Sequence, residues 1–139
     1  MQFAIVAIFF LLGFPNEATG ELTVEVTGMD HLTGTVRIGL YQGEADFLAP
    51  DKVRHGADVR VTGKTVRHTF RDLPAGEYAI SIFHDENDNG KLDTGMFGIP
   101  SEPYGFGNDA RGMFGAPDYG DVVIRLSEGE SRITTVRVK

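Results

Sequence analysis

Short segments with alternating apolar and polar residues recur along most of this chain, and they constrain its fold more than any other feature. The segments are 22–26, 36–40, 59–61, 66–70, 122–126 and 134–138. A period of two predicts half-buried β-strands. A seventh segment, 78–83, is almost continuously apolar and predicts a strand at the centre of a sheet. We therefore expect Tyr78, Ile80 and Ile82 to lie in the core.

Helical signals are almost absent from the same region. Residues 44–54 are the only candidate for a helical turn, and Pro50 limits its length. The predicted fold is a single all-β, seven-stranded sandwich, immunoglobulin-like or transthyretin-like, with one long loop rich in glycine and aromatic residues. The segment 73–78 resembles the tyrosine corner of such sandwiches, with Tyr78 as its tyrosine. The alternative is an ordinary β-turn followed by a core tyrosine.

The first residues of the chain suggest export. Residues 3–14 are almost wholly apolar, but a bilayer-spanning helix needs about 20 such residues. The run fits the apolar part of a signal peptide, and Ala18-Thr19-Gly20 supplies the small residues before a cleavage site. We predict a signal peptide over 1–20 and a domain over 21–139, secreted or periplasmic, with no stable membrane span after cleavage. Met1-Gln2 lacks a basic residue, so a membrane-retained anchor is the alternative.

Composition excludes several classes of protein. The 139 residues suit one domain. Its net charge of −7 becomes −6 without residues 1–20, because Glu17 is the one charged side chain among them. Such acidity argues against nucleic acid as a partner. The chain has no cysteine, which excludes a thiolate nucleophile, a lipidated cysteine and cysteine-ligated metal sites.

Residues 85–93 have the spacing of a calcium-binding loop. Oxygen-bearing side chains occupy loop positions 1, 3, 5 and 9, a glycine lies at position 6, and position 7 offers its backbone carbonyl; these residues are Asp85, Asn87, Asn89, Asp93, Gly90 and Lys91. Met96 replaces the usual bidentate glutamate at position 12, and Glu102 is the nearest acid downstream. We predict a calcium site formed by Asp85, Asn87, Asn89, Lys91 and Asp93. The alternative is a turn rich in Asp and Asn that binds no ion.

A six-residue motif then occurs twice. Gly-Met-Phe-Gly-Ile-Pro over 95–100 is repeated as Gly-Met-Phe-Gly-Ala-Pro over 112–117. Either the two copies present aromatic rings to a ligand, or their Phe97 and Phe114 rings close the open ends of the sandwich. The second is the expectation, because phenylalanine is mostly buried in folded proteins.

The motifs of 73–79, 84–93 and 98–106, taken together, resemble an uncharacterised family of exported bacterial proteins known as domain of unknown function 2141. The resemblance covers nearly all of the predicted mature chain. It implies export, and it implies no activity, cofactor or catalytic residue.

No catalytic motif stands out, so we expect a protein that is not an enzyme. His84 beside Asp85 is a candidate general base, but a hydrogen-bonded residue at a strand end explains it better. Paired carboxylates in 85–93 suit glycoside hydrolysis, yet their spacing is better explained by metal ligation.

Two non-catalytic functions remain. One is a calcium-stabilised structural or interaction domain of the cell envelope with a protein or glycan partner. The other is a small-ligand or carbohydrate-binding module that uses the aromatic loop 97–119. Exposed rings favour the second function, and buried rings favour the first.

Overall fold

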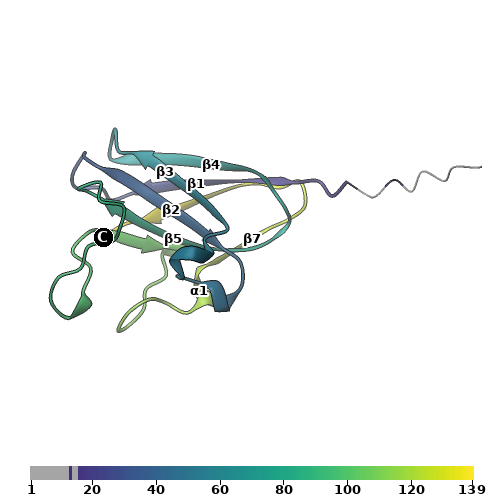
Figure 1. Ribbon diagram of the computed structural model, residues 1–139. Coiled ribbons are helices and arrows are strands. Elements are labelled where there is room, and N and C mark those ends of the chain that lie inside the picture. Colours follow the sequence, from purple (N-terminus) through teal and green to yellow (C-terminus); the bar gives the residue numbers. More distant parts are fainter. Residues whose placement is uncertain (1–12, 14–15) are drawn as a thin grey trace, which may run out of the picture.

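The computed structural model describes Gly13 and residues 16–139, and within them eight strands form two packed sheets (Figure 1). The signal-peptide prediction falls largely on residues 1–12, 14 and 15, which lie outside the described residues. The strands are β1 (Gly20–Thr27), β2 (Thr35–Tyr41), β3 (His55–Arg60), β4 (Thr65–Leu73), β5 (Gly76–Asp85), β6 (Tyr104–Phe106), β7 (Val123–Leu126) and β8 (Ser131–Arg137). The predicted all-β sandwich is confirmed, with eight strands instead of seven.

The smaller sheet, sheet A, has the order β4-β1-β8, and the larger one, sheet B, has the order β3-β2-β5-β6. Strand β7 also pairs with β5, alongside Gly76–Ala79, while β6 pairs with the next part of the same edge at Ser81–Phe83. All pairs are antiparallel except β1 with β8. The extra strand, β6, lies inside the long loop segment that the sequence left without strands.

The core lies between the sheets and follows the alternation in the sequence. Tyr78, Ile80 and Ile82 of β5 are at most 1% exposed, as predicted. The same holds for inward residues of β2 in the same sheet and of β1 and β8 in the opposite sheet, which include Leu22, Val24, Val26, Val36, Leu40 and Val136. The Tyr78 hydroxyl donates a hydrogen bond to the carbonyl oxygen of Pro74 at 2.6 Å. Because this bond runs back to backbone upstream of the strand, it supports the tyrosine-corner interpretation.

Within residues 16–139, helical structure is limited to short turns. Residues 44–54 form two 3₁₀ turns, η1 (Glu44–Asp46) and η2 (Pro50–Lys52). Two more, η3 (Met96–Gly98) and η4 (Gly107–Asp109), lie in the long loop segment. A four-residue helix, α1 (Tyr119–Val122), replaces the start of the strand predicted at Val122. No helix among the described residues is long and apolar enough to cross a membrane.

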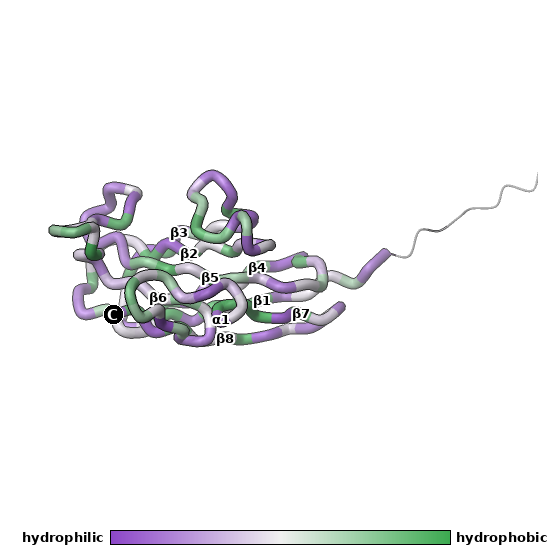
Figure 2. Tube along the Cα trace, turned by 90° about the horizontal axis from the view of Figure 1, so that it is seen from below, coloured by the Kyte–Doolittle hydropathy of each residue, from purple (hydrophilic) through white to green (hydrophobic). Residues whose placement is uncertain are grey.

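The two sheets differ in the character of their outer faces. Sheet A is covered by a threonine pair and by ion pairs such as Arg67 with Glu25 and Arg71 with Glu21. Sheet B carries a second apolar cluster on its outer face, where Tyr41, Ala79 and Phe106 are buried beneath surrounding loops. The candidate sites therefore lie on sheet B, and Figure 2 shows apolar colouring on loops around it.

Candidate functional site

The predicted calcium loop, residues 85–93 and hereafter the Asx loop, begins where β5 ends. Asp85 is fully buried, and the Nε of Arg37 on the neighbouring strand β2 lies 2.7 Å from its Oδ2. The backbone N–H of Gly90 donates to Oδ2 at 2.8 Å and that of Asn89 to Oδ1 at 3.1 Å. Both carboxylate oxygens of Asp85 thus hold the loop closed.

These contacts determine the charge of Asp85. Burial raises the pKa of the carboxyl group, but the hydrogen bond from Arg37 and those from the Gly90 and Asn89 backbone outweigh it, so the pKa lies below its usual value. Arg37 also pairs with Asp58 on β3 at 3.0 Å. The sequence indicated Asp85 as a possible ligand, but its arginine partner depends on the pairing of β2 with β5.

Asp88 forms a second anchor for the Asx loop. Its φ of 56° lies in the left-handed region, as does that of Gly90 at 83°. The Thr35 hydroxyl donates to Asp88 Oδ1 at 2.6 Å, and an Arg60 guanidinium nitrogen donates to Oδ2 at 2.7 Å. The Thr35 bond, together with Arg60, holds the pKa of Asp88 below its usual value. The loop is therefore attached to both β2 and β3.

Three of the predicted ligands meet at the centre of the loop. The side-chain amide of Asn87 donates to Asp93 Oδ2 at 2.7 Å, and that of Asn89 donates to Oδ1 and Oδ2 of Asp93 at 2.7 and 2.9 Å. The N–H of Lys91 donates to Asn89 Oδ1 at 3.1 Å. Asp85 instead faces Arg37. Within the described part of the chain, no three carboxylate or histidine side chains converge, so any ion here would depend on amide oxygens.

Glu102 is buried, and it links the two ends of the Asx loop. Its Oε1 accepts the backbone N–H of Glu86 at 3.0 Å, and its Oε2 accepts that of Asp93 at 2.9 Å. The sequence singled out Glu102 only as the nearest downstream acid. In the structure it fixes the backbone of the loop.

His84 is also fully buried, on the core side of β5. Its Nε2 lies 2.6 Å from the carbonyl oxygen of Thr33, and its Nδ1 has no hydrogen-bond partner among the described residues. The nearest carboxylate oxygen to that nitrogen belongs to Glu86, at 3.9 Å. This arrangement favours the hydrogen-bonded strand-end role over that of a general base.

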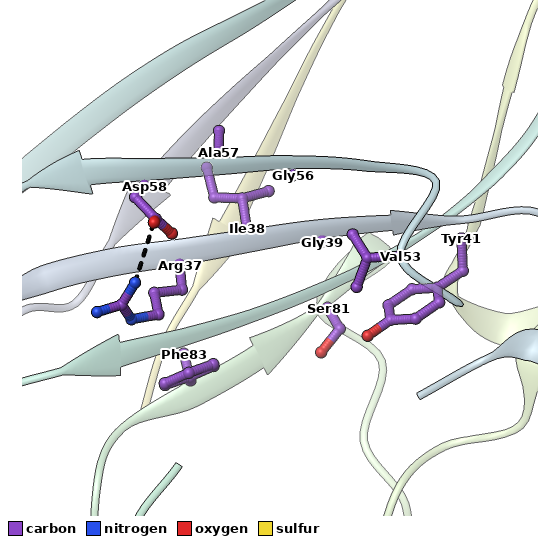
Figure 3. Close-up of a pocket in the computed structure, with 10 residues that line it drawn as sticks. All are labelled: Arg37, Ile38, Gly39, Tyr41, Val53, Gly56, Ala57, Asp58, Ser81 and Phe83. Atoms are coloured by element: carbon purple, nitrogen blue, oxygen red, sulfur yellow. Dashed lines mark ion pairs between the residues drawn. The ribbon is translucent and has the colours of Figure 1, made fainter. Parts of the chain in front are cut away.

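The outer face of sheet B is hollowed next to the Asx loop. Gly39 pairs with Gly56 on one side and with Ser81 on the other, so a row of small residues crosses three strands. Figure 3 shows the hollow above this row, about 300 Å³ in volume, with Tyr41 at one end and the Arg37–Asp58 ion pair at the other. A larger cleft of about 660 Å³ shares part of this lining.

The larger cleft is bordered by both copies of the repeated motif. Gly98 and Pro100 of the first copy and Gly115 and Ala116 of the second line it, together with Phe83 and other apolar side chains of sheet B. We call residues 95–100 and 112–117 the first and second Met-Phe loops. Figure 1 shows both extending from the lower side of the sandwich.

The expectation that the phenylalanines of the repeat close the sandwich is wrong. Phe97 is 92% exposed and Phe114 is 97% exposed, and the preceding Met96 and Met113 are 78% and 88% exposed. The copies also differ in backbone, since the first contains η3 and the second contains only bends. Other aromatics cover sheet B instead, where Phe47 lies 5.8 to 6.2 Å, between ring centroids, from Tyr41, Tyr119 and Phe106.

Both Met-Phe loops have firmly attached bases. In the first, Thr94 bridges to Pro100 and the Gly95 N–H donates to the Ile99 carbonyl oxygen at 2.7 Å. Before the second, Asp109 accepts the Arg137 backbone N–H at 2.8 Å, and Arg111 donates to the Arg137 carbonyl oxygen at 3.0 Å. The exposed rings therefore stand on loops whose bases are hydrogen-bonded to neighbouring backbone.

Comparison with known proteins is consistent with the sequence motifs. No curated protein and no solved structure matches the chain significantly. The model of a family described as an uncharacterised protein conserved in bacteria, DUF2141, matches residues 24–134, which run from the middle of β1 to the middle of β8. Because this match covers most of the chain, the protein belongs to the DUF2141 family.

Proposed function

We propose that this chain is an exported, non-catalytic interaction domain of the cell envelope, secreted or periplasmic, that calcium stabilises. The near-complete exposure of Phe97 and Phe114 beside an apolar cleft argues against a purely structural domain, and it is the observation that carries the interaction role. Soluble domains rarely leave such side chains clustered on the surface, and where they do, the patch commonly marks a binding site. The two loops and the cleft form the interaction surface.

The geometry of the Asx loop supports the calcium component. Turning the Asn87 and Asn89 amides about their last bond would direct two carbonyl oxygens toward the space next to the Asp93 carboxylate. The turn would break the bonds that these oxygens accept from the backbone N–H groups of Asn89 and Lys91, which is a further reason for weak binding. The Lys91 carbonyl is the fourth oxygen source in the predicted set. Calcium takes six to eight oxygens, so water must complete the shell. Arg37 competes for Asp85, which favours weak binding, with a dissociation constant on the order of 10⁻⁴–10⁻³ M.

The environment of the titratable groups supports a non-catalytic role. A general base must be able to reach a substrate proton, but His84 is fully buried and its Nε2 is engaged by Thr33. The carboxylates of Asp85, Asp88 and Glu102 all accept hydrogen bonds from the protein itself. The hydrogen bonds of these side chains hold neighbouring backbone or side chains in place.

A second candidate function is a small-ligand or carbohydrate-binding module, which both the exposed rings and the cleft favour. Its volume of about 660 Å³ lies within the range of about 300–1,000 Å³ that is usual for small-molecule sites. The cleft lining is mostly apolar, and Arg37, Lys91 and Ser81 are its polar side chains besides two tyrosines. In this function the Met-Phe loops form its rim.

A glycan-array screen in millimolar calcium tests these functions with three proteins: wild type, the double variant Phe97→Ala/Phe114→Ala, and Ser81→Leu, which fills the cleft. A glycan partner predicts a binding signal that the double variant abolishes. Loss in Ser81→Leu alone would favour the cleft module. A signal that survives in both variants would contradict the proposed surface, provided that both variants melt at the temperature of wild type.

A further inference from the structure

The two Met-Phe loops hold five large apolar side chains away from the rest of the protein. Met96, Phe97, Ile99, Met113 and Phe114 are 63–97% exposed. The other large apolar side chains that are exposed in the described residues, Leu32, Val53 and Ile133, come from separate elements. The exposed apolar surface is therefore concentrated on two loops that border one cleft.

Neither loop contains a charged side chain or a polar side chain. The sequences are Gly-Met-Phe-Gly-Ile-Pro and Gly-Met-Phe-Gly-Ala-Pro, so their transfer out of water would desolvate no ionised group. Charged residues begin only outside the loops, at Asp93 and Arg111 and at Glu102 and Asp118. A partner that recognises these loops must offer an apolar environment and needs no matching charge.

The backbone of the first loop is also partly suited to leaving water. In the first loop, the N–H of Gly95 and the N–H of Ile99 both donate within the loop, while Pro100 and Pro117 have no N–H. In the second loop, a Cβ on Gly112 would lie 2.1 Å from the Gly115 carbonyl oxygen, so the glycine allows a tight closure. Unpaired backbone groups are the main cost of inserting irregular chain into lipid, and the hydrogen bonds of the first loop reduce it.

We propose that the two Met-Phe loops insert into the surface of a lipid bilayer and dock the domain there as a peripheral protein. This inference rests on the proposed interaction role of the loops and names its partner. Two narrow apolar loops fit a protein only if it has two matching sockets, whereas a bilayer interface accepts them without shape complementarity. The net charge of −6 that remains without residues 1–20 opposes attraction to anionic lipids, so the partner is a zwitterionic surface.

The chain has no tryptophan, so a single introduced indole reports its own depth in the bilayer. Phe97→Trp and Phe114→Trp place the reporter in each loop, and Ile133→Trp, on β8 of sheet A, is the matched control. With phosphatidylcholine vesicles, we expect a blue shift of emission and quenching by brominated lipid in both loop variants. The control should show neither effect.

A second substitution tests how much the Phe114 ring contributes to binding of the bilayer. Phe114→Asp in the Phe97→Trp background should lower the partition coefficient by about tenfold or more, because burying a phenylalanine contributes about 1.5–3 kcal/mol. Its melting temperature should not change. The proposal is overturned if neither loop reporter responds to vesicles, or if binding requires anionic lipid and disappears with salt. If vesicles fail while the glycan screen gives a ring-dependent signal, the lipid partner is excluded and the interaction role stands.

Discussion

Arg37 and Asp85 form the link between sheet B and the Asx loop, with the arginine Nε 2.7 Å from a carboxylate that is fully buried. The pairing of Thr35 with Asp85 and of Arg37 with Phe83 brings the two strands into this register. A buried carboxylate that loses its cation is strongly destabilising. The same pair also places a positive charge beside the first predicted calcium ligand.

Replacing the arginine should therefore be costly near neutral pH. We expect Arg37→Met to lower the free energy of unfolding by about 3–5 kcal/mol at pH 7. Arg67→Met, which breaks an exposed pair with Glu25, should cost about 1 kcal/mol or less. Urea melts of both variants provide the measurement. Equal losses would show that Asp85 does not need its partner.

The pH dependence of that loss follows from the pKa of Asp85. In wild type the pKa is lowered, so the stability from the ionised group is present above the unfolded pKa and is lost as pH falls through the lower folded value. In Arg37→Met, burial without the arginine should raise the pKa. The difference between the two proteins should thus shrink between pH 7 and pH 4. A constant difference over this window would contradict the account.

The tyrosine corner should make a measurable contribution to stability. Tyr78→Phe removes the 2.6 Å hydrogen bond to the Pro74 carbonyl oxygen and should lower the free energy of unfolding by about 0.5–1.5 kcal/mol. The matched control is Tyr119→Phe. The Tyr119 hydroxyl accepts a hydrogen bond from the exposed Gly43 N–H, so its removal should lower the free energy of unfolding by less. The measurement is the denaturant midpoint of each variant, compared at equal m-value. An unchanged midpoint for Tyr78→Phe would show that the Tyr78 hydrogen bond does not stabilise the protein.

The centre of β5 should be the least tolerant position of the core. Ile80 is fully buried, so Ile80→Ala should cost about 2–5 kcal/mol. Ile133→Ala, at a site 66% exposed on β8, should remain within about 0.5 kcal/mol of wild type. A loss below about 1 kcal/mol for Ile80→Ala in denaturant melts would mean that β5 is not central.

Export predicts a new N-terminus at Glu21. In the structure the Glu21 N–H lies 2.8 Å from the Glu130 carbonyl oxygen, so cleavage after Gly20 would leave the α-amino group beside this acceptor. N-terminal sequencing of protein from the periplasm or the medium should begin with Glu-Leu-Thr. Intact Met1 on protein recovered from the cytoplasm would refute the signal-peptide interpretation.

The sandwich could be predicted because the pattern of apolar and polar residues within each strand indicates which side chains are buried. Alternation in β1 and β2, and the apolar run of β5, report burial directly from neighbouring residues. Strand β6 was not predicted because it has only three residues, and the central one, Gly105, is of a type that is rare in strands. There, a Cβ would lie 2.9 Å from the Arg137 carbonyl oxygen, so the glycine permits close approach to β8. The need for a glycine at this position follows from the packing of β6 against β8, which are distant in the sequence.

The candidate site was less predictable for a related reason. The spacing of the Asx loop indicated which residues meet, and Asn87, Asn89 and Asp93 do contact one another. The Arg37–Asp85 contact depends on strand register, which no local pattern encodes. The exposure of Phe97 and Phe114 was mispredicted, because the tendency of phenylalanine to be buried is an average over folded proteins from which a single position can depart.

The measurement that tests the calcium-stabilised interaction domain most directly is thermal melting in millimolar calcium and in chelator. Wild type should melt higher in calcium, with a stabilisation of about 0.4–1.4 kcal/mol at 1 mM calcium for a dissociation constant on the order of 10⁻⁴–10⁻³ M. Asp93→Ala, which removes the carboxylate that both asparagines contact, should abolish the difference. Glu86→Ala, at an even loop position, should retain it. Identical melting of wild type in calcium and in chelator would contradict the account and leave the Asx loop as a turn without an ion.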